Sequence, residues 1–133
     1  MRIIQPIIFC ILLCSTISTI SVAQETDTAQ SAHLVEVPPE FPGGEDALYK
    51  YIGENLVYPR RAKKKNIVGS VVVTFVIERD GSISSIKVLK SPHRLLSKET
   101  IRLVEGMPKW TPGYQRGDTV RVQFVLPIRY KLT

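Results

Sequence analysis

Side chains that could catalyse a reaction are few in this chain and follow no known catalytic pattern. The 133 residues include two histidines, His33 and His93, and two cysteines, Cys10 and Cys14. The sequence contains no HExxH motif, Gly-x-Ser-x-Gly turn, phosphate-binding loop or paired-cysteine metal motif. His93 follows a proline in an expected loop, without a nucleophile or base at a useful spacing, so a structural or solvent-exposed role is favoured. The sequence therefore predicts neither an enzyme nor a cofactor-binding protein.

The main charge feature is a cluster of cations after Pro59. The net charge is +6, from 18 Lys and Arg against 12 Asp and Glu. The cluster, called the basic surface below, comprises Arg60, Arg61, Lys63, Lys64 and Lys65. It is either a solvated helix face or a surface that attracts an acidic partner, an anionic lipid or a wall polymer. Nucleic acid is not expected, because no aromatic side chains interleave with these cations to stack on bases.

The clearest structural pattern is an alternation near the C-terminus, between residues 119 and 130. Its apolar side is formed by Val120, Val122, Phe124, Leu126, Ile128 and Tyr130. A period of two predicts a last strand with one buried and one solvated face. Pro127 favours an edge position for this strand, because proline cannot donate a hydrogen bond to a neighbouring strand. An edge strand can bind an extended peptide.

The remaining patterns predict three helices and a hairpin. Helices are expected over residues 44–55, 59–66 and 97–106, and further strands over 70–78 and 83–89. Ser97 is expected to cap the last helix, and Asp80-Gly81 is a strong turn signal between the two strands. Turn formation also explains Asp118, which adjoins another glycine. The fold expected is α+β, with a small three-stranded antiparallel sheet and helices packed on one face.

The N-terminal residues have the layout of an export signal. Arg2 precedes an apolar stretch, and the small residues Ser21 and Ala23 precede Gln24, which predicts a signal peptide over residues 1–23. The alternative is an uncleaved membrane anchor, although the stretch is near the lower limit of about 17 residues for a span. Both cysteines lie inside it. Residues 24–40 are polar and proline-rich and predict a flexible linker, and the folded domain is expected over 41–133.

The order of these features resembles the C-terminal domain of the TonB energy-transducer family. The matching residues are Tyr58-Pro59, Ala62, Ile67, Gly69, Val71, Val73, Phe75, Asp80-Gly81, Val88, Trp110, Pro112 and Pro127-Ile128. The preceding PPEFPGG segment resembles a variant with an added helix. The resemblance implies a TonB C-terminal-like fold and a periplasmic binding module. Such a module captures the TonB box, a short extended segment of an outer-membrane transporter, as a strand beside its own last strand.

The edge of the last strand is the expected contact with this partner. It comprises Thr119, Val120, Arg121, Val122, Gln123, Phe124, Val125 and Leu126. By analogy with the family, Asn55 before the Tyr-Pro motif approaches the transporter, and Trp110 supports the same region. Trp110 and Tyr58 each also have an interpretation as packing residues.

Two departures from the family pattern bear on energy transduction. A full transducer has an uncleaved inner-membrane helix and a long proline-rich spacer, whereas this apolar segment lacks histidine or another charged group and the spacer is short. Contact with an inner-membrane energising complex is therefore expected only if the N-terminus stays uncleaved. The alternative function is an envelope adaptor or structural protein that binds wall polymer or another envelope protein. An exposed edge also allows two copies to associate as a homodimer.

Overall fold

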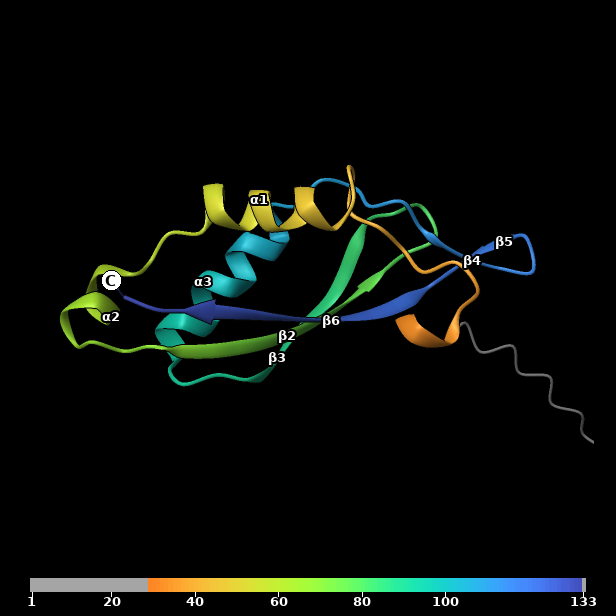
Figure 1. Ribbon diagram of the computed structural model, residues 1–133. Coiled ribbons are helices and arrows are strands. Elements are labelled where there is room, and N and C mark those ends of the chain that lie inside the picture. Colours follow the sequence, from red (N-terminus) through yellow and green to blue (C-terminus); the bar gives the residue numbers. More distant parts are fainter. Residues whose placement is uncertain (1–28, 133) are drawn as a thin grey trace, which may run out of the picture.

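A four-stranded sheet forms the centre of the computed structural model, which describes residues 29–132. Three long strands, β2 (Gly69–Ile77), β3 (Ile83–Lys90) and β6 (Val122–Tyr130), are joined by the short β1 (Gln30–Ser31) in the order β1-β6-β2-β3 (Figure 1). β2 is antiparallel to β3 and β6, and β1 is parallel to β6. The α+β class is confirmed. The sheet has four strands rather than the expected three, because β1 adds to β6.

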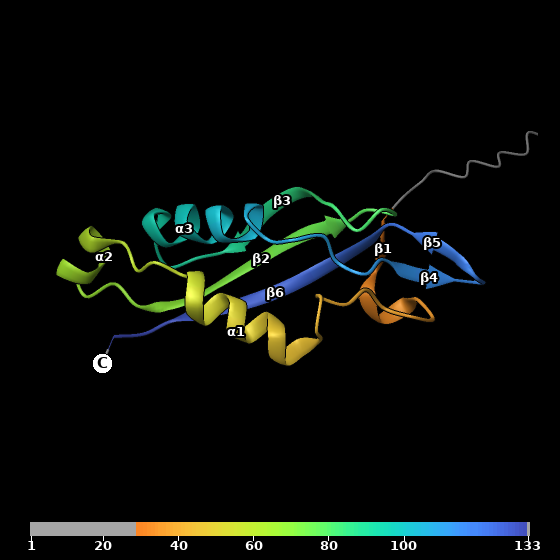
Figure 2. The same ribbon diagram turned by 90° about the horizontal axis from the view of Figure 1, so that it is seen from above.

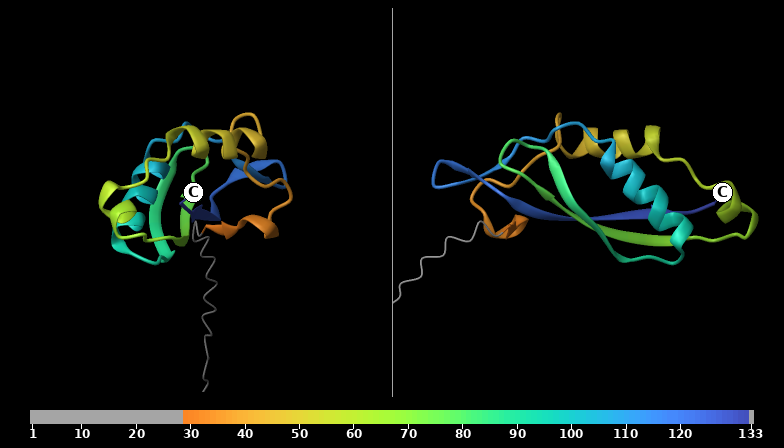
Figure 3. Two further views of the ribbon diagram at one scale, coloured as in Figure 1. Left: turned by 60° about the vertical axis from the view of Figure 1, so that its left-hand side comes forward. Right: turned by 180° about the vertical axis from the view of Figure 1, so that it is seen from behind.

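Three helices lie on one face of this sheet. α1 (Glu45–Asn55) lies beside β6, whereas α3 (Arg94–Glu105) lies along β3 (Figure 2), and α2 (Arg60–Lys64) is at the end of the molecule near the C-terminus. The left-hand view in Figure 3 shows these helices on the same side of the long strands. No helix within residues 29–132 is long and apolar enough to cross a membrane.

Helix starts follow local capping chemistry. Gly44 is the N-cap of α1, and Glu45 and Asp46 occupy its first turn, where the helix dipole favours negative charge. The expected start of α3 at Ser97 is wrong. The N-cap is His93, whose Nδ1 accepts a hydrogen bond from the Leu95 N–H at 3.0 Å. Histidine is not among the usual capping residues, so this cap could not be predicted from the sequence.

The core lies between the helices and the sheet. Alternate side chains of β2 are fully buried in it, namely Val71, Val73, Phe75 and Ile77. The Trp110 ring packs against Phe75, Phe41 and Phe124 at centroid distances of 5.6, 5.6 and 5.0 Å. On β6, the residues from Val122 to Tyr130 that were assigned to the apolar side all face this core. The predicted alternation is confirmed over this range.

The expected last strand is divided in two. β5 (Asp118–Val120) pairs with β4 (Gly113–Gln115) in a separate two-stranded sheet, and β6 starts after Arg121. The Arg121 Nε donates to the Glu78 Oε1 at 2.7 Å, and this bond, with a smaller effect of Ser84, lowers the pKa of Glu78. Residues 119 and 120 therefore belong to the hairpin rather than to the edge of the main sheet.

Residues before the expected domain boundary also contact the domain. Val37 and Tyr114 exchange backbone hydrogen bonds of 3.1 and 2.9 Å, and Glu40 and Thr111 exchange bonds of 3.0 and 2.8 Å. Val35 is only 8% exposed. Contacts with the domain therefore begin within the segment expected to be a flexible linker. The expected signal peptide, residues 1–23, lies outside the described residues.

Tyr130 should make the stability of the domain sensitive to alkaline pH. Its side chain is 1% exposed, and its hydroxyl lies 2.9 Å from the Thr100 Oγ1. Burial raises the pKa of this hydroxyl from 10.0 to about 12. Because the pKa is higher in the folded state, the protonated Tyr130 hydroxyl stabilises the fold relative to the ionised form. This stabilising contribution is complete below pH 10.0 and is lost as the pH rises towards about 12.

We expect this titration to remove about 2 to 3 kcal/mol of unfolding free energy. Urea unfolding at several pH values up to 12 measures the loss. The Tyr130→Phe variant should be less stable at neutral pH but should show a smaller alkaline decline, and an equal decline in both proteins would contradict the assignment.

Candidate functional site

The side of β6 that faces away from β2 is only partly occupied. β1 pairs with β6 only at Val122 and Gln123, and the Gln30 N–H donates to the Arg121 carbonyl at 3.1 Å. No other strand of residues 29–132 pairs with this side of β6. The 3-10 turn Ala32–Leu34 follows β1 directly and also contacts β6. From Phe124 to Arg129 no described strand pairs with this edge, which is called the open edge below.

The backbone groups at this open edge follow from the register. β2 and β6 pair without a shift from Ile77↔Val122 to Gly69↔Tyr130, so alternate residues of β6 direct their backbone groups away from β2. Because the Arg121 carbonyl faces β1, the groups that face outwards are those of Gln123, Val125, Pro127 and Arg129.

Pro127 supports this assignment independently. It lies opposite Val72, and a proline in a continuous ladder must occupy a position that donates nothing to its neighbour. The open edge therefore offers the N–H and carbonyl of Val125 and Arg129 but only the carbonyl of Pro127. Pro127 thus interrupts the row of N–H donors between Val125 and Arg129, both of which can pair with an added strand.

An apolar groove of about 410 Å³ lies beside this edge. Its walls come from β6, from the start of α1 and from the segment before α1, and include Pro39, Phe41, Leu48, Trp110, Phe124 and Leu126. Val125 and Pro127 bring the open edge into the lining. Val125 is 52% exposed, and Tyr49 of α1, also in the lining, is 55% exposed. The groove and the edge therefore form one surface on which backbone pairing and side-chain burial can occur together.

Trp110 joins this groove to the core. It is 3% exposed, and its Nε1 is a buried donor without a hydrogen-bond partner in the described part of the chain. Such groups are rare in folded proteins because an unpaired buried donor costs free energy. The packing role suggested by the sequence is therefore observed, and the same ring also lines the groove.

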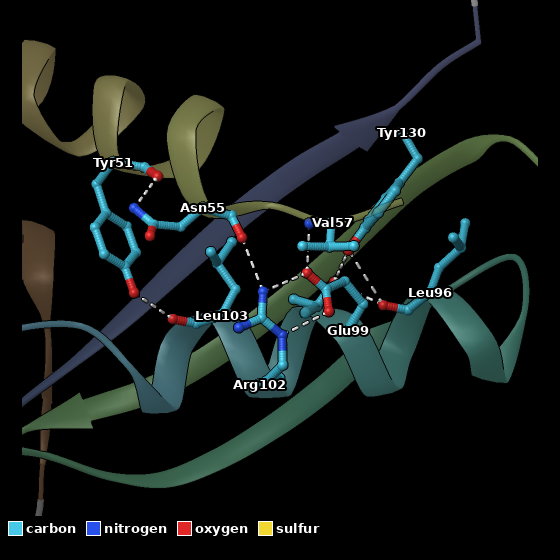
Figure 4. Close-up of polar contacts among 9 residues, drawn as sticks. Tyr51, Asn55, Val57, Leu96, Glu99, Arg102, Leu103 and Tyr130 are labelled. Carbon is cyan, nitrogen blue, oxygen red and sulfur yellow. Dashed lines mark hydrogen bonds and ion pairs between the residues drawn. The ribbon is translucent and has the colours of Figure 1, made fainter. Parts of the chain in front are cut away.

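Asn55 and Tyr58, the other residues expected at the partner contact, lie away from the groove. Asn55 ends α1, about 15 Å along the helix from its first turn. Its carbonyl accepts from Arg102 at 2.8 Å, and its Nδ2 donates to the Tyr51 carbonyl at 2.9 Å (Figure 4). The Tyr58 ring packs edge-to-face on Tyr130 at 5.5 Å. Tyr58 thus contacts the last residue of β6, but neither Asn55 nor Tyr58 lines the groove.

The basic surface is separate from the groove. Ala62 is the buried residue of α2, whereas the flanking cations are exposed and form no ion pair with the residues that the structure describes. α2 lies at one end of the molecule and the β4–β5 hairpin at the other (Figure 1). These cations are therefore free to face solvent or an anionic partner.

The groove wall contributed by the N-terminal segment was not foreseen as part of the site. Glu40, Phe41, Glu45, Leu48 and Tyr49 all line it. The one signal in the sequence was the PPEFPGG segment, which places an aromatic residue between prolines just before a helix. No group of three or more His, Cys, Asp or Glu side chains within residues 29–132 is placed to hold a metal ion.

In comparisons with known proteins, residues 54–132 match the model of one protein family, described as Gram-negative bacterial TonB protein C-terminal. A curated relative, Protein TonB of Campylobacter coli, is 30% identical over 83 residues, which cover 62% of this chain and 34% of the relative. The chain thus spans about a third of that relative's length.

Two solution NMR structures are also similar to this chain. The TonB C-terminal domain of Pseudomonas aeruginosa has a TM-score of 0.48 and 34% identity, covering 57% of this chain and 77% of that one. The TonB C-terminal domain of Helicobacter pylori has a TM-score of 0.49 and 28% identity, covering 69% and 87%.

Proposed function

This chain belongs to the family of Gram-negative bacterial TonB protein C-terminal domains, and we propose that it is a periplasmic binding domain that captures a TonB-box segment of an outer-membrane transporter. The captured segment pairs as an added strand with the open edge of β6. This capture supports transport across the outer membrane without catalysis by the domain itself. An N-terminus that remains in the membrane would add contact with an inner-membrane energising complex.

The observation that supports this proposal is the open edge of β6 beside an apolar groove. Main-chain hydrogen bonds along such an edge supply affinity, and pockets for alternate side chains supply selectivity. Of the edge residues expected from the sequence, we retain Phe124, Val125 and Leu126 and add Pro127 and Arg129, because these lie beyond β1.

The outward backbone donors should control peptide affinity. Val125→Pro removes one outward N–H, and Pro127→Val adds one. Since a hydrogen bond contributes about 1 kcal/mol, we expect binding of a synthetic TonB-box peptide to weaken about fivefold in the first variant and to tighten by a similar factor in the second. Titration of the ¹⁵N-labelled full chain, followed by amide shifts, measures both affinities and locates the site.

Val125→Thr is the matched control, because it changes the same side chain and keeps the backbone N–H. It should bind nearly as well as the natural chain. Unfolding in urea must show that Val125→Pro is folded, which we expect because Pro127 already occupies an equivalent outward position two residues away. If Val125→Pro, Pro127→Val and the natural chain bind the peptide with equal affinity, pairing at this edge is excluded.

An envelope adaptor remains the second candidate function, and the unpaired cations of the basic surface favour it. Exposed charges of one sign steer association with anionic partners, and salt screens this effect. In the same labelled chain, wall-polymer fragments that shift α2 amides at low salt, without shifts at β6, would favour the adaptor over peptide capture.

A further inference from the structure

The charge at the groove is opposite to the charge of the whole protein. The chain carries a net charge of +6, yet the charged residues among those that line the groove are Glu40 and Glu45, both acidic. Both residues are exposed to solvent. No described cation forms an ion pair with either carboxylate.

We propose that the groove selects an extended peptide that carries large apolar side chains at alternate positions and a Lys or Arg at the next position on the same face. This proposal rests on the strand-addition function proposed above and names the class of peptide that the site prefers. The occupant is a peptide segment of a partner protein rather than a small molecule, because the groove adjoins a strand edge that can pair with a backbone.

The alternation of an added strand determines which side chains enter the groove. Residues opposite Phe124 and Leu126 point to the same face of the sheet as these two side chains, which is the face covered by the helices. Residues opposite Val125 and Pro127 point to the other face. Alternate residues of the peptide therefore bury apolar surface against Leu48, Phe124 and Leu126.

The acidic residues limit what the groove accepts at its rim. Glu40 lies close to the start of α1: a Cβ built on Gly44, the N-cap of this helix, would lie 3.3 Å from the Glu40 Oε1. Glu45 occupies the first turn of the same helix. A cationic side chain that emerges from the groove at this end meets two carboxylates, whereas an acidic side chain is repelled by both.

The position of β1 restricts where the peptide can pair. β1 covers Val122 and Gln123, so the accessible edge runs from Phe124 to Arg129, about 20 Å of extended chain. The missing donor at Pro127 disfavours a longer uninterrupted ladder. The groove beside residues 124–127 is therefore the part of the edge where a side chain adds the most to selectivity.

The test compares capped peptides of about eight residues, with leucine at two alternate positions and Lys, Gln or Glu at the next position on the same face. Trp110 is the one tryptophan of the chain, so its fluorescence and its indole N–H resonance report on occupancy of the groove. At low salt, the Lys peptide should bind the full chain about fivefold more tightly than the Glu peptide, with the Gln peptide between them. The difference should shrink at high salt.

Variants of the two carboxylates assign the preference to the groove. In the double variant Glu40→Gln and Glu45→Gln, the Lys and Glu peptides should bind with nearly equal affinity. Asp46→Asn is the matched control, because Asp46 also lies in the first turn of α1 but does not line the groove. This control should keep the preference for the Lys peptide.

Each outcome has a distinct meaning. A Glu peptide that binds as tightly as the Lys peptide, or a preference that survives in the double variant, would overturn the selectivity proposed here. If those peptides still shift the amides of residues 124–129, strand addition itself stands. If no peptide shifts these amides or the Trp110 indole, both the strand-addition function and its selectivity are rejected.

Discussion

Replacing Gly81 with alanine should destabilise the domain by about 3 to 5 kcal/mol. Gly81 has a φ of +89°, and a Cβ at this position would lie 2.0 Å from the Trp110 carbonyl oxygen. Such a contact cannot be relieved by a side-chain rotation, because the atom that is met belongs to the backbone. The two backbones are also joined by a hydrogen bond of 2.8 Å from the Trp110 N–H to the Gly81 carbonyl.

The matched control is Gly117→Ala. Gly117 has a similar φ of +84°, but a Cβ there would meet no atom within 4 Å. Its replacement should therefore cost only the backbone strain, about 1 kcal/mol. Urea unfolding of the two variants separates the clash from the strain. Similar losses in both variants would show that contact with Trp110 is not what requires glycine at position 81.

The Gly81 variant should also affect the proposed binding site. Trp110 lies at the centre of the aromatic cluster and lines the groove, so a displaced Trp110 backbone changes both. At temperatures where the variant is still folded, its tryptophan fluorescence should differ from that of the natural chain. The Gly117 variant should keep the natural spectrum, since a Cβ on Gly117 would meet no atom within 4 Å.

Features with a local cause could be predicted from the sequence. The alternation of β6 comes from the period of two that any strand with one buried face must show. The hairpin between β2 and β3 was predicted from Asp80-Gly81, whose aspartate Oδ1 accepts from the Ser82 N–H at 2.9 Å. The start of α1 follows from Gly44 and two acids in the first turn. Each of these signals involves residues only a few positions apart.

Features that depend on distant residues could not be predicted. β1 consists of the polar residues Gln30 and Ser31, and its pairing depends on groups more than 90 positions away. The break between β5 and β6 at Arg121 does not interrupt the alternation of apolar and polar residues, so the pattern could not reveal it. A hydrogen bond from Arg121 to Glu78, 43 positions away, fixes the chain at that point. The groove needs α1 and β6 in their final positions, so the separate patterns of the two elements could not reveal it.

The second large effect is expected at Glu99, a carboxylate of α3 that is 9% exposed. It accepts the Val57 N–H at 2.7 Å, and its two oxygens accept from the Arg102 guanidinium at 2.7 Å each (Figure 4). Glu99→Ala leaves the Val57 N–H without its partner, and the loss should be about 2 to 4 kcal/mol of unfolding free energy. Glu99→Gln, which keeps an acceptor, should lose about half as much.

Glu105→Ala is the matched control, because Glu105 is an exposed acid of the same helix without a described hydrogen bond or ion pair. Its loss should stay within about 0.5 kcal/mol. Urea unfolding gives the three values, and hydrogen exchange at the Val57 amide shows whether the loss is local. Equal losses in the alanine variants at positions 99 and 105 would contradict a structural role for the Glu99 carboxylate.

The Glu99 network also connects the far end of α1 to the proposed function. Val57 follows α1, and Arg102, which Glu99 orients, donates to the carbonyl of Asn55 at the end of that helix at 2.8 Å. Tyr51 adds a second link, because its hydroxyl donates to the Leu103 carbonyl at 3.0 Å. Since the other end of α1 forms a wall of the groove, loosening this attachment should weaken peptide binding without touching the peptide. The bond from Arg102 uses the backbone carbonyl of Asn55, so replacing the Asn55 side chain removes only its bond to the Tyr51 carbonyl. Such a replacement should change peptide affinity only as far as it changes stability.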